Sequence, residues 1–208
     1  MALTPSTMLA LGVKAPDFQL KDAVSGKTIS LSSFAGKKGL WVMFICRHCP
    51  YVQHIKKELA QLGKDCAAGG LSGAASDSRS HADKDIGIVA VSANDASKYP
   101  DDAPEKLKEM ALEEGFNFPF CYDETQSTAK AYQAACTPDF FLFDEGRTLV
   151  YRGQLDDSRP GNNKPLTGKD LRAAIEALLA GKEIAADQKA SIGCNIKWKP
   201  GNEPGYAR

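Results

Sequence analysis

Two cysteines separated by two residues, Cys46 and Cys49, are the residues of this chain best suited to chemistry. Thiols at this spacing in a turn can close a short disulfide and reopen it, which is the reaction of a thiol–disulfide redox centre. An unbroken apolar run at 40–45 precedes them, and apolar residues at helical spacing follow from Val52 onward. These patterns predict a buried strand that passes into a helix at the thiols. The N–H groups and the dipole at such a helix N-terminus stabilise a thiolate.

We expect Cys46, as the N-terminal and more exposed thiol, to act as the nucleophile, and Cys49 to resolve the mixed disulfide that forms. Arg47 and His48 lie between the two thiols, and their positive charge should lower the pKa of the Cys46 thiol. A solvated loop histidine is the alternative interpretation of His48. Because the oxidised product is the Cys46–Cys49 disulfide itself, we expect no other cofactor and no metal.

The same two thiols could instead hold zinc or copper, with His48 or His54 as a further ligand. A structural zinc site needs a second pair of ligands at matched spacing. The remaining cysteines occur singly along the sequence, as Cys66, Cys121, Cys136 and Cys194. The spacing therefore favours a redox centre over a metal-binding protein, and inert structural thiols are the third alternative.

The composition limits the classes of protein to which the chain can belong. Its 208 residues are 43% hydrophobic, which is enough for a single domain over 1–208 with a substantial core. Lys+Arg and Asp+Glu both number 26, so a basic nucleic-acid surface is not expected. No apolar run approaches the ~18 residues of a membrane span, and the N-terminus lacks the basic region of a signal peptide. We therefore expect a cytoplasmic monomer or homodimer that binds neither nucleic acid nor membranes.

The segments that flank the thiols alternate between strand and helix patterns. An N-terminal β-hairpin is predicted from 15–20 and 27–31, and a second buried strand from 86–91. Residues 63–85 are rich in Gly, Ala, Ser and Asp and lack an apolar period, which is typical of an exposed and flexible insertion.

The C-terminal half continues this alternation. A helix is predicted from Pro104 to about Glu114, with Gly115 as its end. The other expected elements are a strand at 116–121, a helix at 124–135, a hairpin of 140–143 and 149–151, a helix from a Thr167 cap to Leu179, and a C-terminal tail at 182–208. This order predicts an α/β fold with a central mixed β-sheet flanked by helices.

A second chemical feature is Thr137–Pro138, at the head of a predicted buried strand. A proline in that place has lost its hydrogen-bond donor, so its presence needs a reason. With the thiol pair it resembles the thioredoxin fold, in which the matching Thr-Pro has a cis peptide bond, packs beside the thiols and offers its backbone to substrate. We therefore expect a cis Thr137–Pro138 bond that supports the site. Cys136 and Cys194 are further candidates for redox residues, because Cys136 neighbours Thr137 and can approach the thiols in space.

Five motifs extend this resemblance along nearly the whole chain outside 63–85. They are Ala-Pro-Asp-Phe, Phe-Ile-Cys-Arg-His-Cys-Pro-Tyr, Cys-Thr-Pro-Asp-Phe-Phe-Leu-Phe-Asp, Gly-Gln-Leu-Asp-Asp-Ser-Arg-Pro-Gly-Asn and Gly-Cys-Asn-Ile-Lys-Trp-Lys. Together they resemble the peroxiredoxin-like branch of the alkyl hydroperoxide reductase/thiol-specific antioxidant (redoxin) superfamily. The resemblance implies a thioredoxin-like fold and an oxidoreductase with a role in antioxidant defence or thiol redox homeostasis. It also implies protein or small-molecule disulfides or peroxides as substrates, and an external thiol reductant.

The chain departs from both parent families at the thiols. Peroxiredoxins carry a Pro and a Thr or Ser upstream of the peroxidatic cysteine, and with Cys49 in that place the matching residues here are Val42 and Cys46. A peroxiredoxin-like thiol peroxidase is therefore kept as an alternative to disulfide exchange. Thioredoxins carry a buried Asp where this chain has Leu40, so proton transfer from Cys49 needs another base. The candidates are Glu58 and Asp139.

Overall fold

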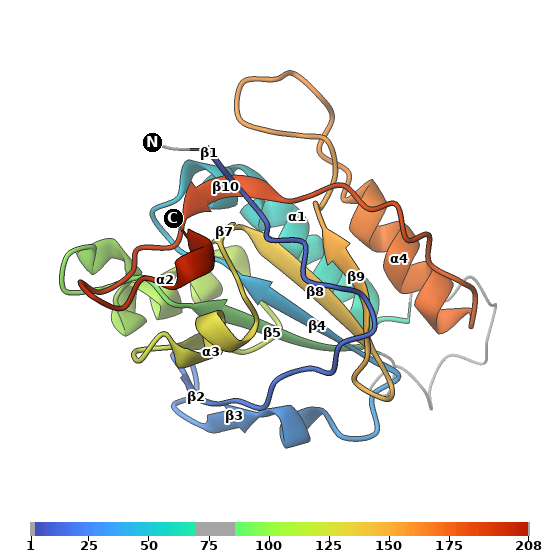
Figure 1. Cartoon of the computed structure of the whole chain (residues 1–208), viewed down its shortest axis with the longest axis horizontal. Coiled ribbons are helices and arrows are strands. Elements are labelled where there is room, and N and C mark those ends of the chain that lie inside the picture. The colour runs from blue at the N-terminus through green and yellow to red at the C-terminus, as the bar shows by residue number, and fades with distance from the viewer. Residues whose placement is uncertain (1–2, 70–85, 208) are drawn as a thin grey trace.

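The computed structural model describes residues 3–69 and 86–207. Its centre is a sheet of seven strands in the order β3-β2-β6-β5-β4-β8-β9 (Figure 1). Pairing is parallel between β4 and β5 and between β5 and β6, and antiparallel between the other neighbours. These strands are β2 (Gln19–Asp22), β3 (Thr28–Ser30), β4 (Gly39–Phe44), β5 (Ile86–Ser92), β6 (Phe120–Tyr122), β8 (Asp139–Asp144) and β9 (Leu149–Gly153). The predicted α/β fold with a central mixed sheet is confirmed.

Helices cover both faces of this sheet. The helices are α1 (Pro50–Ala67), α2 (Pro104–Glu114), α3 (Ser127–Ala131) and α4 (Lys169–Leu179), with short turns η1 (Leu31–Phe34), η3 (Pro100–Asp102) and η4 (Gly205–Ala207). Apolar residues of α1, α2 and α4 pack in one cluster with Trp41 of β4, whereas Ala129 of α3 packs in the cluster on the opposite face. Among the described residues, none of the helices has the length and apolar character needed to cross a membrane.

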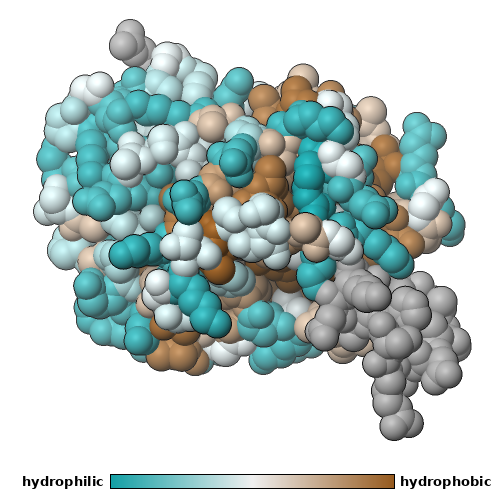
Figure 2. All heavy atoms as spheres, turned by 90° about the horizontal axis from the view of Figure 1, so that it is seen from below, coloured by the Kyte–Doolittle hydropathy of each residue, from teal (hydrophilic) through white to brown (hydrophobic). Residues whose placement is uncertain are grey.

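Strands β4 and β5 are buried along their whole length, as their unbroken apolar runs predict. Successive side chains point to opposite faces of a sheet, so Trp41 and Met43 pack beneath α1 while Val42 and Phe44 join the other cluster. Polar residues dominate the outer surface on the side of the β2–β3 hairpin and surround an apolar patch near its centre (Figure 2). The two clusters bury β4 from both faces, and the thiols follow at its carboxyl end.

Helix α1 is longer than predicted. It continues to Ala67, so the first residues of the predicted insertion 63–85 are helical rather than looped. Gly63 and Cys66 are both buried near this end of the helix. The helix backbone approaches Phe118 closely at Gly63, where an added Cβ would come within 2.9 Å of the ring. The lack of a side chain at Gly63, which in the sequence suggests a loop, instead allows α1 to pack closely against the segment before β6. The rest of the predicted insertion, 70–85, lies outside the described residues.

Two other helices begin at unexpected positions. The predicted Thr167 cap of α4 is wrong, because Gly168 is the N-cap and has a left-handed backbone, φ 66°. The Asp156 carboxylate accepts the backbone N–H groups of both Thr167 and Gly168, and it thereby fixes the start of α4. Helix α3 is one short turn at Ser127–Ala131 instead of the predicted 124–135. The predicted end of α2 is confirmed, with Gly115 at φ 68°.

The C-terminal segment 182–208 contains a strand. Strand β10 (Ile192–Asn195) lies between β1 (Leu3–Pro5) and β7 (Cys136–Thr137) in a small second sheet. The pairing on both sides is antiparallel, with Cys194 opposite Thr137 on one side and Leu3 on the other. The red C-terminal and blue N-terminal segments therefore run together over the end of the central sheet at which β7 lies (Figure 1).

Asp139, which follows Pro138, is fully buried, and this burial raises the pKa of its carboxyl from the ordinary 3.8 to about 7. A carboxyl whose folded-state pKa is raised favours folding below the unfolded pKa, and this contribution is lost as the pH rises through the folded pKa. We therefore expect Asp139→Asn to be more stable than the wild type above pH 7, by on the order of a few kcal/mol. Denaturant titrations at about pH 4 and about pH 8.5 measure this, with the exposed Asp187→Asn as control. Parallel pH profiles of wild type and Asp139→Asn would contradict the prediction.

Candidate active site

The two thiols lie where the sequence predicts them, in the turn between β4 and α1. Cys49 is the N-cap of α1, and Pro50 occupies the first position of the helix. No disulfide joins the two thiols in the structure, and both residues have an exposed fraction of 0%. The expectation that Cys46 is the more exposed thiol is therefore wrong, because the closed turn and the segments around it cover both sulfurs.

Thr137, which precedes Pro138, packs against both thiols. The Thr137–Pro138 peptide bond is cis, as expected. Cys46 Sγ lies 3.4 Å from Thr137 Oγ1, and Cys49 Sγ lies 3.1 Å from the Thr137 carbonyl oxygen, to which the thiol form donates. The structure thus brings together four of the residues that the sequence analysis names for the site.

The negative charge of the thiol pair is stabilised on Cys49. Hydrogen bonds from the Cys46, Cys194 and Thr137 side chains and from the Val52 N–H lower the pKa of the Cys49 thiol to about 5, although burial opposes this. Burial and the hydrogen bond that it donates to Cys49 raise the pKa of Cys46 well above its ordinary value. These two pKa shifts favour a thiolate on Cys49 over the expected thiolate on Cys46. Cys49 is the N-cap of α1, where the positive end of the helix dipole favours a thiolate.

Asp102 organises the turn between the two thiols. This carboxylate is fully buried on η3, and its oxygens accept the Arg47 N–H at 2.7 Å, the His48 N–H at 3.1 Å and the Asn94 side-chain amide at 2.8 Å. It also binds His48 Nδ1. The sequence analysis missed Asp102, because it lies more than 50 residues from the turn and no local pattern links the two.

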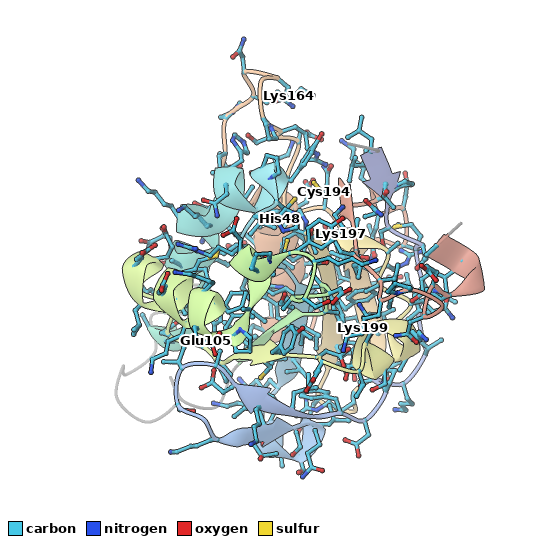
Figure 3. The ribbon with its side chains drawn as sticks, turned by 90° about the vertical axis from the view of Figure 1, so that its left-hand side faces the viewer. His48, Glu105, Lys164, Cys194, Lys197 and Lys199 are labelled. Atoms are coloured by element: carbon cyan, nitrogen blue, oxygen red, sulfur yellow. The ribbon has the colours of Figure 1, made fainter. Side chains whose placement is uncertain are left out.

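His48 is held rather than solvated. Its ring stacks on Tyr99 with centroids 5.3 Å apart and an interplanar angle of 13°. The hydrogen bond to Asp102 raises the pKa of His48 above its ordinary 6.5. The Lys197 ammonium lies over the Tyr99 ring, 5.8 Å from its centroid. Figure 3 shows His48, Cys194 and Lys197 near one another. A titratable imidazole is thus fixed beside the buried thiols.

Arg47 points away from the thiols. Its guanidinium lies 3.5 Å from the Glu109 carboxylate on α2. This pair is partly exposed, so it contributes little to stability. Arg47 therefore acts on the site through its backbone N–H to Asp102, not through the predicted charge effect on Cys46.

The predicted bases for Cys49 do not reach it. Glu58 forms an ion pair with Arg172 of α4 at 2.7 Å. Phe140 packs in the cluster that contains the thiols and Phe141 in the opposite one, so Asp139 lies on the far face of the sheet. Instead, the Cys46 sulfur, a His48 ring nitrogen and an Asp102 oxygen lie within 4.8 Å of one another. The His48–Asp102 pair thus lies beside Cys46, where it can exchange a proton with the thiol.

Each of the two histidines considered as metal ligands already has a hydrogen-bond partner in the structure. His48 Nδ1 is bound by Asp102, and His54 Nε2 lies 2.8 Å from Ser158 Oγ. Of the two, only His48 lies beside Cys46. A metal on this set would have to displace the buried hydrogen bond of Asp102.

The other four cysteines are buried in different surroundings. Cys194 of β10 hydrogen-bonds to Cys49, so the structure brings this candidate to the site. Cys136 Sγ lies 3.4 Å from the Pro138 carbonyl oxygen, and burial raises the pKa of its thiol well above the ordinary value. Cys66 lies in α1 and Cys121 in β6, where burial raises the pKa of Cys121 to about 12.

The pH dependence of alkylation tests the placement of the thiolate. We expect the reaction of Cys49 with iodoacetamide to rise through a midpoint near pH 5, because its pKa is lowered to about 5 from the ordinary 9.0. Trypsin separates the two thiols by cutting after Arg47, so mass spectrometry of the digests follows each one. Cys46→Ala removes one donor and should move the Cys49 midpoint to higher pH. A profile in which Cys46 is alkylated first at low pH would overturn the assignment.

The Redoxin family model matches residues 10–171 of the chain. The chain belongs to the Redoxin family. This membership confirms the resemblance drawn from the motifs and supports a thiol redox function. No curated protein sequence matches the chain.

Solved structures agree with this membership of the Redoxin family. An uncharacterized conserved protein from Geobacillus kaustophilus is 46% identical with a TM-score of 0.86, over 96% of this chain and 98% of that chain. A hypothetical protein from Sinorhizobium meliloti is 43% identical with a TM-score of 0.85, over 95% of this chain and 100% of that chain. The thioredoxin domain of a thiol-disulfide oxidoreductase from Bacteroides vulgatus is 20% identical with a TM-score of 0.58, over 82% of this chain and 99% of that chain. The last likeness shows the thioredoxin-like fold.

Proposed function

We propose that the protein is a thiol–disulfide oxidoreductase whose redox centre is the pair Cys46 and Cys49. The observation that carries this proposal is the hydrogen-bonded thiol pair at the N-terminus of α1, with the charge on Cys49 and Thr137 against both sulfurs. A stabilised thiolate next to a second thiol is the arrangement that disulfide exchange needs.

Because its pKa is lowered, Cys49 is the attacking sulfur in this proposal. Its thiolate attacks one sulfur of the substrate disulfide, and the other substrate sulfur leaves as a thiolate. Cys46 then attacks Cys49 in the mixed disulfide, releases the second substrate sulfur and forms the Cys46–Cys49 disulfide. The proton of Cys46 can pass to the nearby His48–Asp102 pair. An external thiol reductant returns the disulfide to two thiols, so no further cofactor enters the cycle.

A thiol peroxidase is the second candidate, and the enclosure of the thiols favours it. Both sulfurs are 0% exposed, which suits a small substrate such as a hydroperoxide better than a protein disulfide. The Cys49 thiolate would attack one peroxide oxygen and break the O–O bond, which with uptake of one proton gives an alcohol and a Cys49 sulfenic acid. Cys46 would then condense with the sulfenic acid, releasing water and forming the same Cys46–Cys49 disulfide.

Three assays with dithiothreitol as reductant separate these functions: insulin reduction, reduction of glutathione disulfide, and consumption of hydrogen peroxide. Disulfide reduction that is lost in Cys49→Ser and kept in Cys121→Ser is the expected result, because Cys121 is a buried thiol in the cluster on the opposite face of the sheet. Peroxide consumption without disulfide reduction would replace the first proposal with the second. Activity that survives Cys49→Ser would refute both.

A further inference from the structure

Strand β10 occupies the backbone edge beside the cis proline. It pairs antiparallel with β7, with Cys194 opposite Thr137 and Asn195 opposite Cys136. The approach is closer than a side chain allows, because a Cβ at Gly193 would lie 2.0 Å from the Thr137 carbonyl oxygen and 3.1 Å from Pro138 Cδ. The C-terminal strand is therefore fitted to this edge, and its next residue is a cysteine.

Cys194 reaches the thiol pair from this strand. Its side chain is 2% exposed, packs in the same apolar cluster as Cys46 and Cys49, and hydrogen-bonds to Cys49. The Cys49 sulfur thus has two thiol neighbours, Cys46 on its own turn and Cys194 on the opposite strand. Cys136 adjoins Thr137 in the chain, but its sulfur lies against the Pro138 carbonyl oxygen.

We propose that Cys194 is a third redox residue, which exchanges with Cys46 as the disulfide partner of Cys49; this rests on the proposed redox function of the pair. Deprotonated Cys194 attacks the Cys49 sulfur of the Cys46–Cys49 disulfide. The bond between Cys46 and Cys49 breaks as the bond between Cys49 and Cys194 forms. Cys46 leaves as a thiolate and takes up the proton that Cys194 lost, so the exchange consumes no oxidant.

The exchange changes what the oxidised centre can do. A Cys49–Cys194 disulfide joins the N-terminus of α1 covalently to β10 and returns Cys46 to the thiol form. By the same attack, Cys194 can release a substrate bound to Cys49 when Cys46 is absent. The single variant Cys46→Ser should therefore keep part of its turnover, and the double variant Cys46→Ser/Cys194→Ser should hold the substrate as a mixed disulfide on Cys49.

Disulfide mapping of the full chain tests the exchange directly. Tryptic cleavage after lysine and arginine places each of the six cysteines in a different peptide, with Cys46 in 39–47, Cys49 in 48–56 and Cys194 in 190–197. The reduced protein is oxidised with diamide, quenched with acid, alkylated and digested. Wild type is expected to yield both the 39–47/48–56 and the 48–56/190–197 crosslinks. In Cys46→Ser the second crosslink should become the main one, and in Cys194→Ser it should be lost.

Cys136→Ser is the matched control, because it removes a buried thiol of the same small sheet and should leave both crosslinks unchanged. Absence of the 48–56/190–197 crosslink from both wild type and Cys46→Ser would overturn the role of Cys194 while leaving the function of the pair intact. Absence of the 39–47/48–56 crosslink, together with loss of disulfide reduction, would instead refute the proposed function. The wild-type map needs no variant, so a variant that fails to fold does not weaken the test.

Discussion

Asp102→Ala is expected to unfold the turn that carries the thiols and to destabilise the protein by on the order of 3–5 kcal/mol. The substitution removes a fully buried carboxylate that accepts hydrogen bonds from two backbone N–H groups, from Asn94 and from His48. Each buried donor left without an acceptor costs about 1–3 kcal/mol. Cys46 and Cys49 flank the released backbone, so disulfide reduction should fall with the stability.

The pH dependence of this loss follows from two pKa shifts. Burial alone would raise the pKa of Asp102, but hydrogen bonds from His48 and Asn94 outweigh it and hold the pKa below the ordinary 3.8. The stability from this group is present above pH 3.8 and is lost as the pH falls through the folded value. The pKa of His48 is raised, so the contribution of this group to stability is fully present below pH 6.5. That contribution is lost as the pH rises through the folded-state pKa of His48. The difference between wild type and variant should therefore be largest between these limits.

Urea denaturation across this pH range measures the effect, with Asp101→Ala as the matched control, because Asp101 is the exposed neighbour on the same turn. Asp102→Asn keeps the shape and one acceptor oxygen but removes the charge, so it should lower the pKa of His48 measured by NMR. If Asp102→Ala were as stable as Asp101→Ala, the carboxylate would not hold the turn.

The sequence predicts the parts of the site that are local along the chain. The apolar run before Cys46 gives β4, Pro50 marks the first turn of α1, and the resemblance around Thr137 gives the cis bond. Each of these features depends on a few adjacent residues whose hydropathy pattern or restricted backbone conformation specifies the local structure. The same holds for Gly115, which ends α2 because it adopts φ 68°.

Long-range contacts account for what the sequence does not predict. The charge lies on Cys49 because donors from three separate segments, including Cys194 and Thr137, meet at that sulfur. Asp102 is one of two adjacent aspartates, and only the fold shows which of them turns inward. A composition rich in small residues suggests a loop after Leu62, yet α1 continues because Phe118 packs on Gly63. Burial patterns of this kind arise from the partner segment and not from the local sequence.

Gly193→Ala is expected to separate β10 from β7. The added Cβ would lie 2.0 Å from the carbonyl oxygen and 2.6 Å from the carbonyl carbon of Thr137. Both are backbone atoms, so neither can move aside as a flexible side chain would. Overpacking in such a place costs typically about 1–3 kcal/mol, and the strand must shift to relieve it. Cys194 moves with the strand, so Cys49 loses a hydrogen-bond donor and its pKa should rise from about 5.

Two measurements follow Gly193→Ala. Urea denaturation should show the loss of stability, and native-state alkylation should show faster modification of Cys194 together with a Cys49 midpoint at higher pH. Gly205→Ala is the matched control, because Gly205 is an exposed glycine of the same C-terminal segment with no atom within 4 Å of the added Cβ. The control should match wild type in both measurements. Wild-type stability and a protected Cys194 in Gly193→Ala would mean that β10 has room beside Thr137, and that its contact with the thiol pair does not depend on the glycine.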